Sequence, residues 1–174
     1  MTACNRKGSV VVDVVIAAAM IIFVVLPVFS AVIEKYILME KARVIRDAVD
    51  MTNISAYNGI KTGSLGQASV KFERSEVNEI FRELLCTNLA LDRGMYPKYG
   101  SIAEGRVEVS SLEIYTDVFP VVCPEGSAIV KPSVHSSINV PVKPSLYRGL
   151  VLRLLGKDHI DVEVHVDSEI PVNR

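Results

Sequence analysis

The sequence predicts an α+β protein in which a long amino-terminal helix, with a membrane-crossing part and a stem, carries a small head with a second helix and an antiparallel sheet. Three observations predict this class. An uncharged apolar run stands near the start, apolar residues then recur at helical spacing, and strict alternation replaces that spacing towards the carboxyl end. The part of the 174 residues beyond the long helix suits one ordinary small domain.

The apolar run extends from Val14 to Ile33 and contains 20 residues without a charge, VVIAAAMIIFVVLPVFSAVI. As a helix it is long enough to cross a hydrocarbon core of about 30 Å. A secretory signal peptide has a shorter apolar core followed by a small-residue cleavage site, which is missing here. We therefore expect a retained membrane helix, kinked rather than broken at Pro27, since neighbouring groups can satisfy the freed carbonyl.

Helical spacing continues beyond the membrane run. The apolar face of this stem consists of Leu38, Ala42, Ile45, Val49 and Thr52. We expect one helix over residues 9–57 that ends at Asn58-Gly59, and a loop over the Gly/Ser-containing residues 58–69. Packing against a core or another helix explains the stripe.

A second amphipathic helix is predicted in the head. Its apolar face comprises Val77, Ile80, Phe81, Leu84, Leu85 and Leu89. Ser75 is placed to cap its start, and Gly94 is placed to end it because glycine adopts the left-handed conformation at little cost.

Three strands follow. The first changes phase at Ser110-Ser111, which predicts a β-bulge. The second spans residues 134–142, and Pro132 just before it and Pro141 within it favour an edge position or an early end. Residues 145–156 suit either a short helix or a turn, with apolar side chains that would cover the sheet. The last strand alternates most clearly, with Ile160, Val162, Val164 and Val166 on one face.

Composition excludes several functions. The net charge is −1, no basic cluster occurs and tryptophan is absent, so the electrostatic footprint and stacking platforms of a nucleic-acid-binding protein are missing. The chain contains no nucleophile elbow, P-loop, H-E-x-x-H or C-x-x-C motif. We therefore expect a protein that is not an enzyme and needs no cofactor.

The polar face of the last strand carries residue types that bind metal ions. It carries Asp161, Glu163, His165 and Asp167, with His159 in the same parity. Successive members of such a row lie about 6–7 Å apart at a rise of 3.3 Å per residue. A solvated face explains the row better, so we expect no metal site.

The stretch RKGSVVVD places an acid, Asp13, at the start of the apolar run. An unpaired carboxylate in lipid costs several kcal/mol, so a cationic partner is expected. The alternative is that Asp13 lies in the headgroup layer near Arg6 and Lys7. If the chain is cut after Gly8, Ser9 becomes the first residue and Asp13 the fifth.

These residues resemble the prepilin-peptidase signature of type IV pilin-like proteins, in which a short basic leader ends in Gly and an acid follows at the fifth mature position. Arg6, Lys7, Gly8 and Asp13 match this pattern, although the family usually has glutamate at the fifth position. The resemblance implies cleavage between Gly8 and Ser9 on the cytoplasmic face. The new Ser9 ammonium is then neutralised by Asp13 of a neighbouring subunit in a low-dielectric filament core.

Within that superfamily the chain is most similar to the TadE-like minor pilins, or pseudopilins, of the tight-adherence (type IVc) pilus. The similarity rests on the Gly-Ser start, the uninterrupted helix, Tyr36 after the membrane run and the strand pattern in INVPVKPSLYRGLVLRLLGKDHIDVEV. Major Flp-type pilins are much shorter and carry Tyr where Val14 stands here. The resemblance implies a structural subunit without catalytic activity.

The organisation implied is a leader over residues 1–8, a transmembrane and stem helix over 9–57, and an extracytoplasmic head over 58–174, in a single-pass membrane protein that reaches a cell-surface pilus. The implied partners are the membrane, other pilin subunits, a prepilin peptidase, an inner-membrane assembly platform and a secretion ATPase. The rival interpretation is an uncleaved, membrane-anchored extracytoplasmic binding module, which has no need of Gly8.

Two observations bear on the side of the membrane. Removal of the leader takes away Cys4 and leaves Cys86 and Cys123, an even number that suits a disulfide in an oxidising compartment, with two buried free thiols as the alternative. The positive-inside rule opposes an outside head, because more basic residues follow the span than precede it. We give precedence to the cleavage motif, which requires the leader to be inside.

Overall fold

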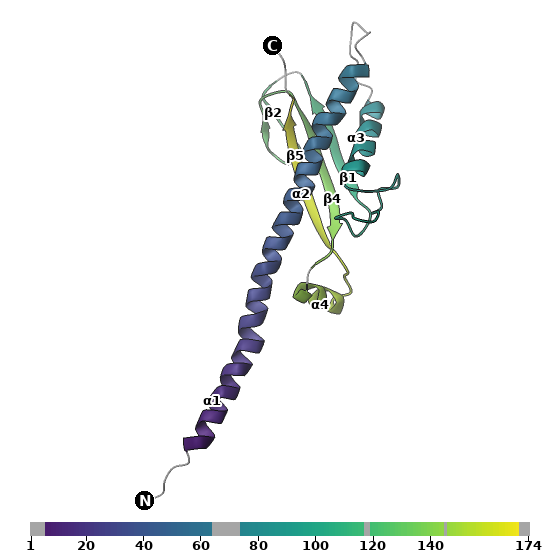
Figure 1. The fold of residues 1–174 in the computed structure, drawn as a ribbon. Helices are drawn as coiled ribbons and strands as arrows, with labels where there is room; N and C mark the ends of the chain where they lie inside the picture. The colour runs from purple at the N-terminus through teal and green to yellow at the C-terminus, as the bar shows by residue number, and fades with distance from the viewer. Residues whose placement is uncertain (1–5, 64–73, 117–118, 145, 171–174) are drawn as a thin grey trace, which may run out of the picture. The chain divides into compact units, whose positions relative to one another are not determined.

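The computed structural model describes residues 6–63, 74–116, 119–144 and 146–170. These residues form the predicted α+β fold, with a long amino-terminal helix and a small antiparallel sheet (Figure 1). The chain divides into two compact units. The first comprises Met1–Met39 and Pro144–Asp158, and the second comprises Glu40–Lys143 and His159–Arg174.

The amino-terminal helix consists of three segments without an intervening loop: α1 (Arg6–Met20), the π-helical turn η1 (Ile21–Val25) and α2 (Leu26–Gly63). The N–H of Leu26 donates to the carbonyl of Ile21, five residues earlier. The next residue, Pro27, has no N–H to donate. The proline thus sits beside a π-helical turn inside a continuing helix, a local adjustment of the kind that satisfies freed carbonyls.

The structure corrects the predicted end of this helix. Asn58-Gly59 does not stop it, and α2 runs on to Gly63, so part of the expected loop is helical. Residues 64–69 of that loop lie outside the described part of the chain.

The apolar side chains of the first unit are exposed. Phe23 is 77% exposed and Phe29 is 62% exposed, and the most apolar window of the helix contains no buried residue. By length and composition the helix is able to cross a membrane. This part of the chain therefore has an apolar surface that the described residues of its own unit leave exposed.

The first unit also contains α4 (Leu146–Leu154), which decides the open question about residues 145–156 in favour of a helix. The carboxylate of Glu34, which is only 3% exposed, accepts a hydrogen bond of 3.3 Å from the N–H of Arg148 in the first turn of α4. Such an acid satisfies an otherwise free N–H and complements the helix dipole. Leu154 and Leu155, two of the apolar residues that were expected to cover the sheet, are exposed.

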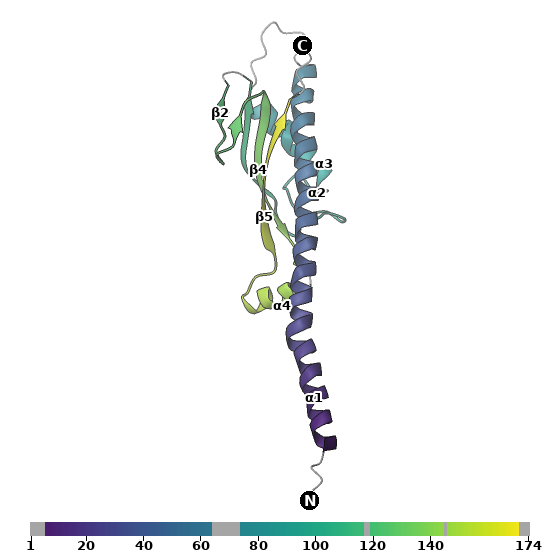
Figure 2. The same cartoon turned by 90° about the vertical axis from the view of Figure 1, so that its left-hand side faces the viewer.

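The second unit is built on a sheet in the order β1-β4-β5, with both pairings antiparallel (Figure 2). Its strands are β1 (Glu108–Tyr115), β4 (Ser133–Val142) and β5 (Ile160–Glu169). The register of β1 against β4 shifts between Val109 and Ser111, which confirms the predicted bulge. A separate two-stranded hairpin consists of β2 (Val121–Val122) and β3 (Ala128–Ile129).

The central strand corrects a second expectation. Pro132 and Pro141 favoured an edge position, yet β4 pairs on both sides. The carbonyl of Pro141 accepts from the N–H of Glu104, so its backbone faces away from β5, and the β1 ladder has already ended at the Glu108–Asn139 pair. The missing N–H of Pro141 therefore falls where no ladder partner is needed.

The core of the second unit lies between the helices and one face of the sheet. Its fully buried side chains include Ile45, Val49, Phe81, Leu85, Leu91, Val134, Ile138 and Val140. The predicted stripe on α2 is confirmed at Ile45, Val49 and Thr52. Two polar contacts fix this packing: Asn53 Nδ2 donates to Ser168 Oγ over 2.9 Å, and Asn88 of α3 (Arg74–Asn88) donates to Thr52 Oγ1 over 2.8 Å.

Helix α3 ends earlier than Gly94 predicts. It stops at Asn88, and Ala90 adopts a left-handed conformation with φ of 52°. The N–H of Leu91 donates to the carbonyl of Cys86, and that of Ala90 donates to the carbonyl of Thr87, which together form a Schellman motif. Gly94 instead donates to the Asp92 side chain in the following turn.

An Ala90→Gly variant tests this helix end. Glycine removes the steric cost of the left-handed conformation, and its larger conformational entropy in the unfolded state cancels only part of this gain. We therefore expect the free energy of unfolding to rise by about 0.5–1 kcal/mol. Urea unfolding of the full chain in detergent, followed by circular dichroism, measures the change. An Ala90→Val variant should shift it in the opposite direction, and equal stability of the three proteins would contradict the assignment.

Candidate functional site

The amino-terminal motif lies at the start of the long helix. The backbone of Arg6, Lys7, Gly8 and Ser9 is already helical in α1, and residues 1–5 of the predicted leader lie outside the described part of the chain. Asp13 is exposed on α1. It follows Ser9 by four positions, which places the two on one helix face about 6 Å apart along the axis.

The predicted disulfide between Cys86 and Cys123 is wrong, because both residues are free thiols. The Cys86 thiol donates to the carbonyl of Asp92 over 2.9 Å and lies 3.5 Å from Met95 Sδ. Burial, and secondly the charge of Asp92, raises the pKa of Cys86 above its usual range. Cys123 belongs to a different polar cluster, described next.

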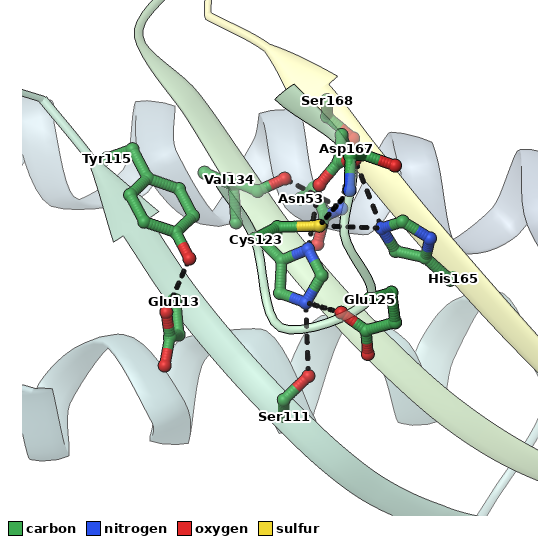
Figure 3. A network of polar contacts seen from close by, with 12 residues as sticks. Asn53, Ser111, Glu113, Tyr115, Cys123, Glu125, Val134, His165, Asp167 and Ser168 are labelled. Atoms are coloured by element: carbon green, nitrogen blue, oxygen red, sulfur yellow. Dashed lines mark hydrogen bonds and ion pairs between the residues drawn. The ribbon is translucent and has the colours of Figure 1, made fainter. Parts of the chain in front are cut away.

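The sheet presents two faces with different roles. Asn53 of α2 donates a hydrogen bond to Ser168 of β5, so the even-numbered residues of β5 face the helices. His165 and Asp167 of β5 therefore lie on the opposite face, where Figure 3 shows Cys123 and Glu125 in front of the strands. This group of polar residues, with His135 of β4, is called the outer-face cluster below.

His135 is the centre of the outer-face cluster and is fully buried. Its Nδ1 lies 2.7 Å from Asp167 Oδ1, on the residue directly opposite in the β4–β5 register. Its Nε2 lies 2.9 Å from Glu125 Oε2 and 3.2 Å from Ser111 Oγ on β1. The imidazole is thus held between two carboxylates.

The β2–β3 hairpin supplies Cys123 and Glu125. The N–H of Cys123 donates to the carbonyl of Ser127, and the N–H of Gly126 donates back to the carbonyl of Cys123. Gly126 has a φ of 89°, a left-handed value that closes this short turn without a side-chain clash. The N–H of Ser127 also points at Cys123 Sγ over 3.3 Å, and Cys123 is buried.

His165 completes the cluster from β5. Its Nε2 lies 3.0 Å from Asp167 Oδ2 and 3.9 Å from Cys123 Sγ, and its ring centre is 4.8 Å from that of His135 (Figure 3). One ligand atom each from Cys123, Glu125, His135 and His165 lie within 4.8 Å of one another.

The outer-face cluster revises the expectation of a solvated row on β5. Asp161 and Glu163 are exposed as expected, but the side chains of His165 and Asp167 are each only 26% exposed and take part in the cluster. Candidate ligands were expected along one strand only, and this expectation missed Cys123 and Glu125 of the hairpin and His135 of β4. The Cys-Pro-Glu-Gly turn was the available signal for two of them.

Tyr115 on β1 borders the cluster. Its ring meets that of His135 edge to face, with centres 6.4 Å apart. Its hydroxyl donates to Glu113 over 2.5 Å, and burial together with this bond raises the pKa of Tyr115 well above its usual range. The phenol therefore stays protonated at any physiological pH.

Comparisons of the chain with family models, with curated proteins and with solved structures found no match.

The free thiols are directly testable. Denatured but unreduced protein should be alkylated at both Cys86 and Cys123, as mass spectrometry of the peptides would detect. In the native protein the alkylation rate of Cys86 should rise with pH around a midpoint above that of a free thiol, because burial disfavours the thiolate. A Cys4→Ser/Cys123→Ser double variant isolates the Cys86 signal, because these are the other two cysteines of the sequence. A Cys86–Cys123 peptide linked before reduction would contradict the structure.

Proposed function

We propose that this chain is a pilin-like structural subunit that a prepilin peptidase cleaves and that takes part in assembly of a tight-adherence pilus. The observation that carries the proposal is the order of features at the amino end. A basic pair, Gly8-Ser9 and then Asp13 precede an exposed apolar helix that continues, without a loop, into the stem. No catalytic role is proposed.

The exposed apolar surface of the first unit supports an assembly role. Side chains from Val10 to Ile33 are largely exposed, and monomeric soluble proteins rarely show apolar patches of such extent. Lipid covers this surface before assembly, and helices of neighbouring subunits cover it in a filament. The remaining partners, an inner-membrane platform and a secretion ATPase, are proposed from the resemblance alone.

Asp13 gives the assembly its register. Cleavage after Gly8 creates an ammonium group on Ser9, and an ammonium or a carboxylate alone in a low-dielectric environment is costly. Within one chain the two charges lie one helical turn apart. Pairing Asp13 with the Ser9 ammonium of a neighbour favours one axial offset between helices, so the charges position each incoming subunit.

The orientation of the protein rests on the cleavage motif. Cys86 and Cys123 are free thiols and give no support to an oxidising compartment for the head. A prepilin peptidase acts on the cytoplasmic face, so the leader is inside and the head is outside the cytoplasm. This topology is part of the proposal and depends on cleavage of the leader at Gly8.

Leader removal is the first test. The membrane-fraction protein from the native host should begin at Ser9, and a Gly8→Ala variant should retain the leader, as intact mass and amino-terminal sequencing would measure. Val10→Ala, two residues from the cleavage point, is the matched control and should be processed normally. A native chain that still begins at Met1 would refute the pilin proposal and support the uncleaved anchored module.

Asp13 is the second test. Asp13→Ala should be processed and membrane-inserted but should reduce incorporation into surface filaments roughly tenfold or more, because an unneutralised charge costs several kcal/mol. Immunoblots of sheared filaments against the membrane fraction measure the ratio. Asp13→Glu retains the charge and should assemble. Normal incorporation of Asp13→Ala would remove the proposed role of this residue.

A further inference from the structure

We propose that the head binds one Zn²⁺ ion through Cys123, Glu125, His135 and His165, and that this ion fastens the β2–β3 hairpin to the outer face of the sheet. The inference rests on the outer-face cluster alone and is independent of the proposed pilus function. All four residues belong to the second compact unit.

The donor set has the chemistry of a zinc site. A thiolate, two imidazoles and a carboxylate are ligands of Zn²⁺, whereas Mg²⁺ and Ca²⁺ take oxygen ligands almost exclusively. Bonds of about 2.0–2.3 Å in a tetrahedron separate ligand atoms by roughly 3.3–3.6 Å. The four atoms here already lie within 4.8 Å of one another, and the Cys123 Sγ–His165 Nε2 pair is at 3.9 Å. Small side-chain rotations close the site.

Asp167 orients the buried ligand. Its carboxylate lies 2.7 Å from Nδ1 of His135, so that nitrogen carries the proton and donates it. In the neutral imidazole this tautomer leaves a lone pair on Nε2, directed towards Glu125. Carboxylate–histidine–metal triads use this arrangement to fix the ring and raise its basicity.

The contact between His135 Nε2 and Glu125 requires a proton or a metal ion between the two atoms. A lone pair and a carboxylate oxygen 2.9 Å apart repel each other unless a proton or a metal ion lies between them. Ser111 has a single hydroxyl proton and cannot serve both acceptors at once. Protonation of His135 is the competing explanation, in which an imidazolium is clamped by Glu125 and Asp167 without metal.

Charge balance favours the ion in this environment. Binding takes a proton from the Cys123 thiol, and Zn²⁺ with one thiolate, one carboxylate and two neutral imidazoles has no net charge. His165 gives up the contact between Nε2 and Asp167 Oδ2, its proton moves to Nδ1 through solvent, and the Nε2 lone pair then binds the metal. Because Cys123 and His135 are buried, a neutral set of ligands and ion avoids the cost of an unpaired buried charge.

The proposed ion has a structural role at the β2–β3 hairpin. Strands β2 and β3 contribute only two residue pairs, and Ile129 is buried whereas Val122 and Val130 are exposed. An isolated two-stranded hairpin is marginally stable in water. Ligands from the hairpin turn, Cys123 and Glu125, are joined by the ion to His135 on β4 and His165 on β5. The metal therefore acts as a cross-link between two sheets.

Metal binding by the unaltered protein is the decisive experiment. Full-length protein in detergent is treated with a chelator, dialysed and titrated with Zn²⁺, and separately with Co²⁺. We expect one equivalent to bind, thiolate-to-Co²⁺ charge-transfer absorption to appear, and the midpoint of thermal unfolding to rise on addition of Zn²⁺. No stoichiometric uptake, or an unchanged midpoint, would overturn the proposal and leave the imidazolium clamp as the explanation.

Matched variants locate the ion. Cys123→Ser and His165→Gln should lose the bound equivalent, whereas Cys86→Ser and His159→Gln should retain it because those side chains lie outside the cluster. Asp167→Asn should keep the stoichiometry but weaken affinity about 10–100-fold, as loss of an orienting carboxylate usually does. Circular dichroism verifies folding of each variant. Retained binding in Cys123→Ser, or loss in Cys86→Ser, would contradict the assignment.

Discussion

The antiparallel register of β4 against β5 is the constraint on which the head depends. It sets His135 opposite Asp167 and Ser137 opposite His165, so the two histidines are diagonal neighbours on one face. The same register puts Val134 and Val166 on the other face, against the helices. Because side chains alternate with a period of two, a shift by one residue would exchange the faces and bury the outer-face cluster in the apolar core.

Buried polar contacts hold the long helix against this sheet in one position. Asp50 accepts from Ser168 Oγ over 2.5 Å, and Asn53 donates to the same hydroxyl, so one β5 side chain joins two consecutive turns of α2. Apolar packing alone tolerates sliding and rotation better than hydrogen bonds, which demand defined distances and angles. Loss of either partner would leave a buried polar group unsatisfied, and sliding of the helix has the same cost.

Periodicity predicted most of the fold but little of the cluster. The stripe at Ile45 and Val49, the bulge near Ser110 and the alternation of β5 are local patterns, and each appears as expected. The central place of β4 depends on tertiary pairing, and the end of α3 at Asn88 depends on a left-handed conformation at Ala90 that alanine rarely adopts. The cluster needs both the register and the placement of a separate hairpin, which no spacing in the sequence encodes.

A common physical demand connects the two proposed sites. Along the amino-terminal helix, exposed apolar side chains up to Ile33 give way to buried ones from Ile45 onwards, so the first stretch presents an apolar surface to its surroundings. In the proposed pilin assembly, the Ser9 ammonium and Asp13 are each costly in a low-dielectric environment, and pairing them removes much of that cost. In the proposed zinc site, Zn²⁺, the Cys123 thiolate and Glu125 follow the same rule. Under these two proposals, charge neutrality selects an intermolecular register at one end and an intramolecular cross-link at the other.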